Sequence, residues 1–163
     1  MLTEQQKAAL RQIAAAAVES ERATGCPAEL TVAQCILESG WLRRAPGNNP
    51  FGIKRAARHQ KFQTFMTTEF IGGQKVKKPL QFAAYDSLAE AFSDHAGLIT
   101  RGRPYARAWA QYQLDRDVEA LARGIAGVYA TDPSYAEKVL SFVRHPEVRL
   151  AVSDARGPES RVA

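Results

Sequence analysis

The pattern of apolar residues changes its period between residues 62 and 83, and this change limits the folds open to the chain. Two sets of side chains alternate there, Phe62, Thr64, Met66, Thr68 and Phe70 against Gln63, Phe65, Thr67 and Glu69. Such alternation is typical of a β-strand. Gly72 and Gly73 separate this run from a second one, KVKKPLQFAAY, so the segment is predicted to be a β-hairpin. Pro79 must then lie on a strand edge or at a bulge, because it has no backbone N–H.

The rest of the chain has the period of amphipathic helices. The predicted helices are residues 3–22, 27–39, 88–101, 104–112, 115–130 and 133–145. Thr3, Ser87 and Asp115 are predicted N-caps, and Gly40 is a predicted helix stop. The apolar period then ends, so residues 149–163 are predicted to be a flexible tail behind one domain, residues 1–148. The predicted fold class is α+β, a mostly helical body with one small hairpin inserted after the second helix.

The composition indicates one globular domain with a basic surface. A length of 163 residues with 45% hydrophobic residues excludes a disordered chain. The net charge of +5 favours an anionic partner, which can be a nucleic acid, a membrane surface or an acidic cell-wall polymer. The strongest basic cluster is Lys54, Arg55, Arg58, Lys61, Lys75, Lys77 and Lys78. Its plain interpretation is a solvated hairpin, and its functional interpretation is attraction to an anionic polymer.

Several other classes of protein find no support in the sequence. The first helix carries charges where a signal peptide needs an apolar core, and no run is long enough to span a membrane. Cys26 and Cys35 have no metal or redox spacing and are interpreted as core residues, although a bridge between them remains open. His59, His95 and His145 have no grouping typical of metal ligands. We therefore expect no metal and no cofactor.

Glu38 is the first candidate for chemistry, within the stretch CILESGWLRR. It falls in the last turn of a predicted helix, where the helix dipole disfavours a carboxylate. Leu37 and Trp41 flank it and can remove water from around it. Both effects raise a pKa toward that of a general acid. The alternative is an ordinary solvated charge at a helix end.

Glu69 is the second candidate, because it is the only acidic residue between Glu38 and Asp86. In the alternation it shares a face with Gln63 and Thr67. A solvated strand carboxylate is the plain interpretation. If Glu69 instead faces Glu38 across a cleft, the two form the carboxylate pair that glycosidic bond cleavage usually needs.

Several segments together resemble the glucosaminidase domains of glycoside hydrolase family 73, which include bacterial autolysins, flagellar peptidoglycan hydrolases and some phage lysins. The matching segments are AQCILESGW, NNPFGIK, MTTEF, FAAYDSLAEAFSDHAGLI, the Arg-Pro-Tyr at residues 103–105, and GVYATDPSYAEKV. They occur in the family's order and cover roughly residues 5–145. The segments ESGWLRR and NPFG depart from the commoner ESGWG and NLFG, so details of the sugar subsites stay open.

The resemblance implies a lysozyme-like α+β fold with a cleft between a helical lobe and a small β-lobe. It implies hydrolysis of peptidoglycan between N-acetylglucosamine and N-acetylmuramic acid, on the glucosamine side. Matched residue by residue, Glu38 is the general acid, Glu69 the second carboxylate and Tyr129 an active-site tyrosine. The expected substrate-binding residues are Trp41, Asn49, Phe51, Tyr85 and Tyr105. Asn49 and Phe51 match the loop along which the substrate passes, and the aromatic rings suit the apolar faces of sugars.

Mechanism and setting stay open at this point. Glu69 either activates water in an inverting reaction or supports attack by the substrate's own acetamido group. The rival activities are a lytic transglycosylase, which needs no Glu69, and a non-catalytic binding module for cell wall or nucleic acid. The family often has a signal peptide or wall-binding modules, and their absence here favours a phage- or prophage-type lysin or a domain cut from a longer protein. The expected partner is the glycan strand, bound by a monomer that does not bind nucleic acid.

Overall fold

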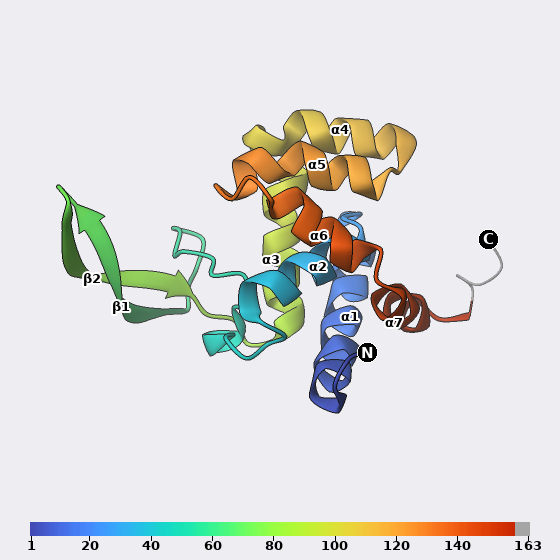
Figure 1. The fold of residues 1–163 in the computed structure, drawn as a ribbon, viewed down its shortest axis with the longest axis horizontal. Coiled ribbons are helices and arrows are strands. Elements are labelled where there is room, and N and C mark those ends of the chain that lie inside the picture. The colour runs from blue at the N-terminus through green and yellow to red at the C-terminus, as the bar shows by residue number, and fades with distance from the viewer. Residues whose placement is uncertain (159–163) are drawn as a thin grey trace.

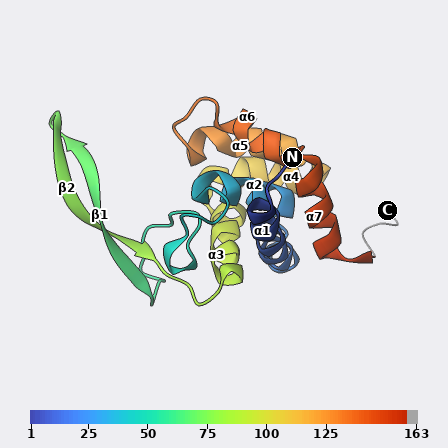
Figure 2. The same ribbon diagram turned by 60° about the horizontal axis from the view of Figure 1, so that its bottom comes forward.

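The computed structural model describes residues 1–158, in which helices form one body and a hairpin extends from it (Figure 1). The elements are α1 (Glu4–Thr24), α2 (Ala28–Ser39), the 3-10 turn η1 (Pro46–Asn48), β1 (Phe62–Ile71), β2 (Gln74–Ala83), α3 (Leu88–Arg101), the 3-10 turn η2 (Arg103–Tyr105), α4 (Ala106–Asp115), α5 (Val118–Tyr129), α6 (Tyr135–Val143) and α7 (Pro146–Arg156). The hairpin projects to one side of the helices in both views (Figures 1 and 2). The predicted α+β architecture is confirmed.

Local signals in the sequence set the helix ends. Thr3 caps α1, because its hydroxyl accepts a hydrogen bond from the Gln6 N–H at 3.2 Å, while the Gln6 side chain accepts one from the Thr3 N–H. Ser87 caps α3 in the same way, with the Glu90 N–H as donor. Gly40 ends α2 in the left-handed conformation, at φ 59°. These three predicted boundaries are confirmed.

Helix α2 lies at the centre of the body and packs against α1, α5, α6 and α7. It supplies Val32 and Ile36 to one buried cluster, shared with α1 and α7. It supplies Leu30 and Ala33 to a second cluster, shared with α5 and α6. A helix that is apolar all round belongs in a core. The end of α2 is therefore a rigid place for a functional side chain.

The hairpin has the predicted turn and register. Gly72 and Gly73 both have positive φ, 58° and 80°, as a two-residue hairpin turn requires. The strands are antiparallel, and Glu69 pairs with Val76. Pro79 pairs with Met66 in a two-stranded sheet, where each strand has a free edge that tolerates a missing N–H.

The prediction of a flexible tail from residue 149 is wrong for residues 149–156. Pro146 does not only stop α6, because it also occupies the first turn of α7, where a missing N–H costs nothing. Val148 and Val152 are one helical turn apart and fully buried. Arg156 forms ion pairs with Glu21 and Glu29 at 2.6 Å and 2.7 Å. Residues 159–163 of the predicted tail lie outside the described residues.

Three further sequence expectations concern the two cysteines, a membrane span and a metal site. Cys26 and Cys35 are free and fully buried, and burial raises the pKa of each thiol to about 12. They are inert core residues, as interpreted. Among residues 1–158, no helix combines the length and apolar character that crossing a bilayer requires. Within the same range, His, Cys, Asp and Glu side chains form no group of three that can hold a metal ion.

Candidate active site

A sharp reversal of the backbone presents Glu38 at the end of α2. Gly40, Trp41 and Leu42 follow one another with left-handed φ values of 59°, 63° and 65°. The two non-glycine residues are conformationally strained there. The buried Ser39 hydroxyl stabilises the reversal by accepting a hydrogen bond from the Leu42 N–H at 2.9 Å. The chain thus turns away directly after Glu38 and leaves its side chain exposed.

The Glu38 carboxyl opens into a pocket of about 270 Å³ between the helical body and the base of the hairpin. The pocket joins three segments, and its lining includes Glu38, Arg44, Pro46, Asn49, Gln63, Phe65, Thr67 and Phe82. The Gln63 side chain spans the loop and the hairpin, because its amide donates to the Pro46 carbonyl at 2.6 Å. The lining therefore combines aromatic carbon from Phe65 and Phe82 with polar groups, which is the mixture that sugar rings contact well.

The surroundings of Glu38 favour a proton donor. Burial by the pocket walls raises the pKa of the carboxyl above its ordinary value, although one side stays open to solvent. No basic residue lies in the last turn of α2 to offset the helix dipole. A carboxylic acid that stays protonated closer to neutral pH is suited to general acid catalysis.

Glu69 shares a face of β1 with Gln63, Phe65 and Thr67, as the alternation predicts. The last three line the Glu38 pocket, whereas Glu69 lies one step further toward the turn and is not part of the lining. The structure thus places both carboxylates on the same side of the hairpin but does not bring them together. The role of Glu69 stays a prediction.

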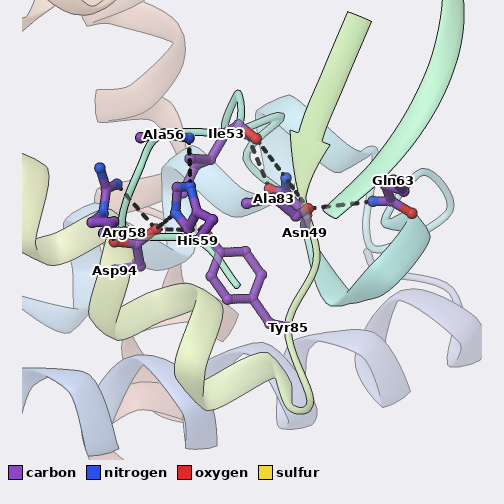
Figure 3. A network of polar contacts seen from close by, with 9 residues as sticks. All are labelled: Asn49, Ile53, Ala56, Arg58, His59, Gln63, Ala83, Tyr85 and Asp94. Atoms are coloured by element: carbon purple, nitrogen blue, oxygen red, sulfur yellow. Dashed lines mark hydrogen bonds and ion pairs between the residues drawn. The ribbon is translucent and has the colours of Figure 1, made fainter. Parts of the chain in front are cut away.

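The loop between α2 and β1 is held by Asn49. Its side chain is 4% exposed and makes three hydrogen bonds: its amide donates to the carbonyls of Ile53 and Ala83, both at 3.0 Å, and its oxygen accepts from the Ile53 N–H at 3.1 Å (Figure 3). Asn49 also lines the pocket. It therefore joins the pocket loop to the end of β2.

Phe51 was predicted to bind substrate, but its ring is in the core. Only 7% of the residue is exposed, and the ring stacks on His95 with centroids 3.8 Å apart. It also contacts Phe92 edge to face. A ring enclosed in this way supports the loop from below and cannot contact a sugar.

Asp94 on α3 gathers three side chains around the base of the hairpin (Figure 3). Arg58 binds it through two nitrogens, at 2.9 Å and 3.2 Å. The Nδ1 atom of His59 accepts from the Ala56 N–H, so His59 donates to Asp94 through Nε2 at 2.8 Å. The Tyr85 hydroxyl donates to the same carboxylate at 2.5 Å. Tyr85 was predicted to bind substrate, but its hydroxyl is hydrogen-bonded to Asp94.

Asp94 is expected to make the protein sensitive to acid. Burial of Asp94 acts to raise its pKa, and the hydrogen bonds from Arg58, Tyr85 and His59 outweigh burial and lower it from 3.8 to about 2. The folded state therefore holds the proton less tightly than the unfolded state. This contributes about 2 kcal/mol of stability above pH 4, which is lost as the pH falls toward 2.

The measurement is chemical denaturation of wild type and Asp94→Asn across this pH range. The variant is expected to be less stable at pH 6, and the difference should shrink as the pH falls toward 2. Asp86→Asn is the matched control, because among residues 1–158 the Asp86 side chain pairs only with Lys61, and both side chains are more than 60% exposed. A difference between wild type and Asp94→Asn that does not change with pH would refute the assignment.

The remaining predicted residues, Trp41, Tyr105 and Tyr129, do not line the pocket. Trp41 packs edge to face on Phe142, with centroids 5.7 Å apart. Tyr105 is partly buried against the second core cluster. Tyr129 ends α5, where its ring stacks on Tyr135 at 5.3 Å. Burial raises the pKa of Tyr129 well above its ordinary value, and the nearby charge of Glu38 adds to this effect.

Pocket residues that the sequence analysis did not single out include Arg44, Pro46 and Phe82. The sequence analysis placed Gln63, Phe65 and Thr67 on the same strand face as Glu69. That alternation is the sequence signal from which this side of the pocket could be found.

Another hollow, of about 410 Å³ between α4 and α5, also contains carboxylates. Its two aspartates act as turn and helix caps, since Asp115 accepts from the Asp117 N–H and Asp117 from the Ala120 N–H. Asp117, not Asp115, is therefore the N-cap of α5.

Comparison with known families agrees with this geometry. A model of the glucosaminidase family, described as mannosyl-glycoprotein endo-beta-N-acetylglucosaminidase, matches residues 14–147. The chain belongs to the glucosaminidase family. Membership indicates a glycoside hydrolase, and the matched range contains Glu38, Glu69 and Tyr129.

Individual relatives extend the comparison. This glucosaminidase-family chain is 36% identical over 146 residues to the peptidoglycan hydrolase FlgJ of Escherichia coli K12, covering 85% of the chain and 46% of that protein. It is 37% identical over 136 residues to a probable N-acetylmuramidase of Lactococcus lactis, covering 77% of the chain and 30% of that protein. The glycoside hydrolase domain of Salmonella typhimurium FlgJ superposes with a TM-score of 0.71 at 32% identity, covering 85% of the chain and 95% of that domain. The chain thus spans less than half the length of these two curated relatives.

Proposed function

We propose that this chain hydrolyses peptidoglycan at the bond between N-acetylglucosamine and N-acetylmuramic acid, on the glucosamine side. One observation carries the proposal: a carboxyl with a raised pKa stands at a helix end, inside a pocket between a rigid helical body and a hairpin. The family match supports a cell-wall substrate, and so do the FlgJ relatives, which are named peptidoglycan hydrolases. The site of action is then the cell wall, outside the cytoplasm.

Glu38 gives its proton to the leaving glycosidic oxygen in this proposal. Its backbone is fixed by α2 and by the reversal at residues 40–42, so the carboxyl is held in place before substrate arrives. The face of β1 that carries Gln63, Phe65 and Thr67 contacts the sugar opposite Glu38. Glu69 is the second carboxylate, and it acts either on water or in support of the acetamido group. Neither route needs a metal.

The bond that is cut distinguishes the proposal from a neighbouring one. The Lactococcus relative is named a probable N-acetylmuramidase, which is an activity on the muramic acid side. Both activities create new reducing ends in purified peptidoglycan, and the sugar at that end differs. Release of reducing ends by the wild-type chain tests the hydrolase proposal. No increase over a heat-inactivated sample would refute it.

A lytic transglycosylase is the second candidate, because Glu38 is the only carboxylate among the residues that line the described pocket. Such an enzyme needs no second carboxylate and leaves anhydro-muramic ends instead of reducing ends. The contribution of Glu69 separates the two candidates.

Three assignments stay predictions: that the protein is a monomer, that it does not bind nucleic acid, and that it is a phage- or prophage-type lysin.

Glu69→Ala is expected to lower hydrolysis at least tenfold while leaving the folded state intact, because a second carboxylate acts by acid–base or charge effects worth about 10²–10⁴-fold. Added azide should restore part of the activity if Glu69 activates water. The measurement is solubilisation of purified peptidoglycan, because it counts cleavage whatever kind of end is formed. Glu19→Ala is the matched control, since Glu19 is an exposed carboxylate on α1. Full activity of Glu69→Ala would favour the transglycosylase instead.

A further inference from the structure

The backbone reversal that follows Glu38 also brings Arg44 back to the end of α2. Trp41 and Leu42 have left-handed φ values of 63° and 65° in the reversal, and the Arg44 N–H donates to the Ser39 carbonyl at 2.9 Å. Strained backbone of this kind persists only where the surrounding structure holds it, and it is common at functional sites. The reversal thus fixes a cationic residue next to the proposed general acid.

The Arg44 guanidinium lies against the helix end, where a glycine leaves room for it. A Cβ atom at Gly40 would be 3.4 Å from Arg44 Nη2 and 3.7 Å from Arg44 Cζ, so a larger side chain would compete for the same space. Gly40 therefore has two effects. It adopts the φ of 59° that ends α2, and it leaves open the position that the guanidinium occupies.

Arg44 is exposed and has no partner within the described part of the chain. Its side chain forms no ion pair and no hydrogen bond among residues 1–158, whereas Arg58, Arg144 and Arg156 all bind carboxylates. It is the only cation among the residues that line the described pocket. Burial raises the pKa of Glu38, so the charge of Arg44 does not hold Glu38 in its ionised form.

An unpaired guanidinium fixed at a pocket is suited to binding a carboxylate. When Glu38 is protonated, as a general acid must be, Arg44 carries the only full charge in the pocket lining. The two sugars of the proposed substrate differ in one substituent, because N-acetylmuramic acid carries a lactyl ether that ends in a carboxyl group. That group is either a free carboxylate or the attachment point of a stem peptide, which has carboxylates of its own.

We propose that Arg44 is a specificity-determining residue that binds a carboxylate of the muramic acid unit, in its lactyl group or its stem peptide, while Glu38 acts on the neighbouring bond. The inference rests on the proposed function, since it names the group that the same pocket recognises in the glycan strand. An exposed ion pair contributes modestly to affinity, and its main effect is to select among ligands. Loss of Arg44 therefore raises KM and changes kcat little.

Binding is measured on a protein that carries Glu38→Gln, so that the strands stay intact during a calorimetric titration. Three forms of soluble glycan strand are compared: strands with stem peptides, strands without peptides and so with free lactyl carboxylates, and peptide-free strands whose carboxylates have been amidated. Adding Arg44→Gln is expected to weaken binding of a carboxylate-bearing form about three- to tenfold and to change binding of the amidated form less than about twofold.

The form that is affected identifies the carboxylate. A loss confined to strands with peptides assigns it to the stem peptide, and a loss confined to peptide-free strands assigns it to the lactyl group. Unchanged affinity for every form, or an equal loss for the amidated form, overturns the inference. The second result would mean that Arg44 supports the shape of the pocket and does not read a charge.

Arg43→Gln is the matched control, because Arg43 is the exposed neighbour of Arg44 and is not part of the pocket lining. It removes the same net charge, so equal losses in the two variants overturn the inference. Arg44→Lys keeps the charge without the planar fork and should restore part of the affinity. Thermal unfolding of each variant confirms that the proteins compared are folded.

Activity separates a failure of this inference from a failure of the proposed function. With Glu38 in place, Arg44→Gln should raise KM for the selected strand about three- to tenfold and change kcat less than about twofold. Hydrolysis without such a change in KM overturns the inference and leaves the proposed function standing. Absence of hydrolysis by wild type refutes the proposed function, and the binding comparison still decides whether Arg44 binds a carboxylate.

Discussion

Replacing Glu38 by glutamine is expected to remove nearly all hydrolytic activity, by about 10²–10⁴-fold, while the fold is kept. Glutamine has the shape of glutamate but no acidic proton to give to the leaving oxygen. The same change removes a negative charge from a helix C-terminus, so the stability should stay equal or rise by a few tenths of a kcal/mol. Activity is measured as release of reducing ends, and stability by thermal unfolding.

The combination of lost activity and retained stability distinguishes catalysis from structure. Glu19→Gln is the control, because it changes an exposed carboxylate on α1 that lies outside the pocket. The raised pKa of Glu38 also predicts that wild-type kcat falls as the pH rises through that pKa, since the acid form is the active one. Retention of more than about a tenth of wild-type activity by Glu38→Gln would remove Glu38 from the role of general acid.

Asn49→Ala is expected to have the largest effect on stability among the pocket residues. It removes three hydrogen bonds and takes the partner from the buried Ile53 N–H, while the carbonyls of Ile53 and Ala83 keep one donor each, the Ala83 N–H and the Gln63 amide. Each such loss costs about 1 kcal/mol, so the free energy of unfolding should fall by about 3 kcal/mol. Activity per folded molecule should fall too, because the pocket loop is released from the end of β2. Urea denaturation measures the first effect and reducing-end release the second.

Asn48→Gly is the matched control for Asn49, because Asn48 has a left-handed φ of 55° that glycine adopts without the strain alanine would have. Asn48 is its exposed neighbour and donates one hydrogen bond, to the Tyr85 carbonyl at 3.0 Å. Its loss should cost at most about 1 kcal/mol. Equal effects of the two substitutions would mean that the buried hydrogen bonds of Asn49 do not hold the loop.

Much of the fold was predictable because its signals are local. The hairpin follows from alternation over a few residues and from Gly72–Gly73, and the placement of Glu38 follows from the helix stop at Gly40. α7 was missed because its buried residues are few and small, and its stability comes from packing on α1 and from the ion pairs of Arg156. Pairing of that kind cannot be read from a short segment.

The site was predictable in part, for a related reason. Glu38 and the inner face of β1 could be named from sequence, but Phe51 and Tyr85 carry the same residue types as sugar-binding rings and turned out to face the core and Asp94. Gln34 and Tyr135 share a buried hydrogen bond although they are 101 positions apart. Only the packing of α2 against α6 brings them together, so neither residue shows a signal on its own.

Mass spectrometry of purified peptidoglycan digested by the wild-type chain tests the central claim most directly, because it identifies the sugar at the new end of each fragment. The account predicts fragments that end in a reducing N-acetylglucosamine, and none of these with Glu38→Gln. Fragments that end in reducing N-acetylmuramic acid, or in its anhydro form, would contradict it.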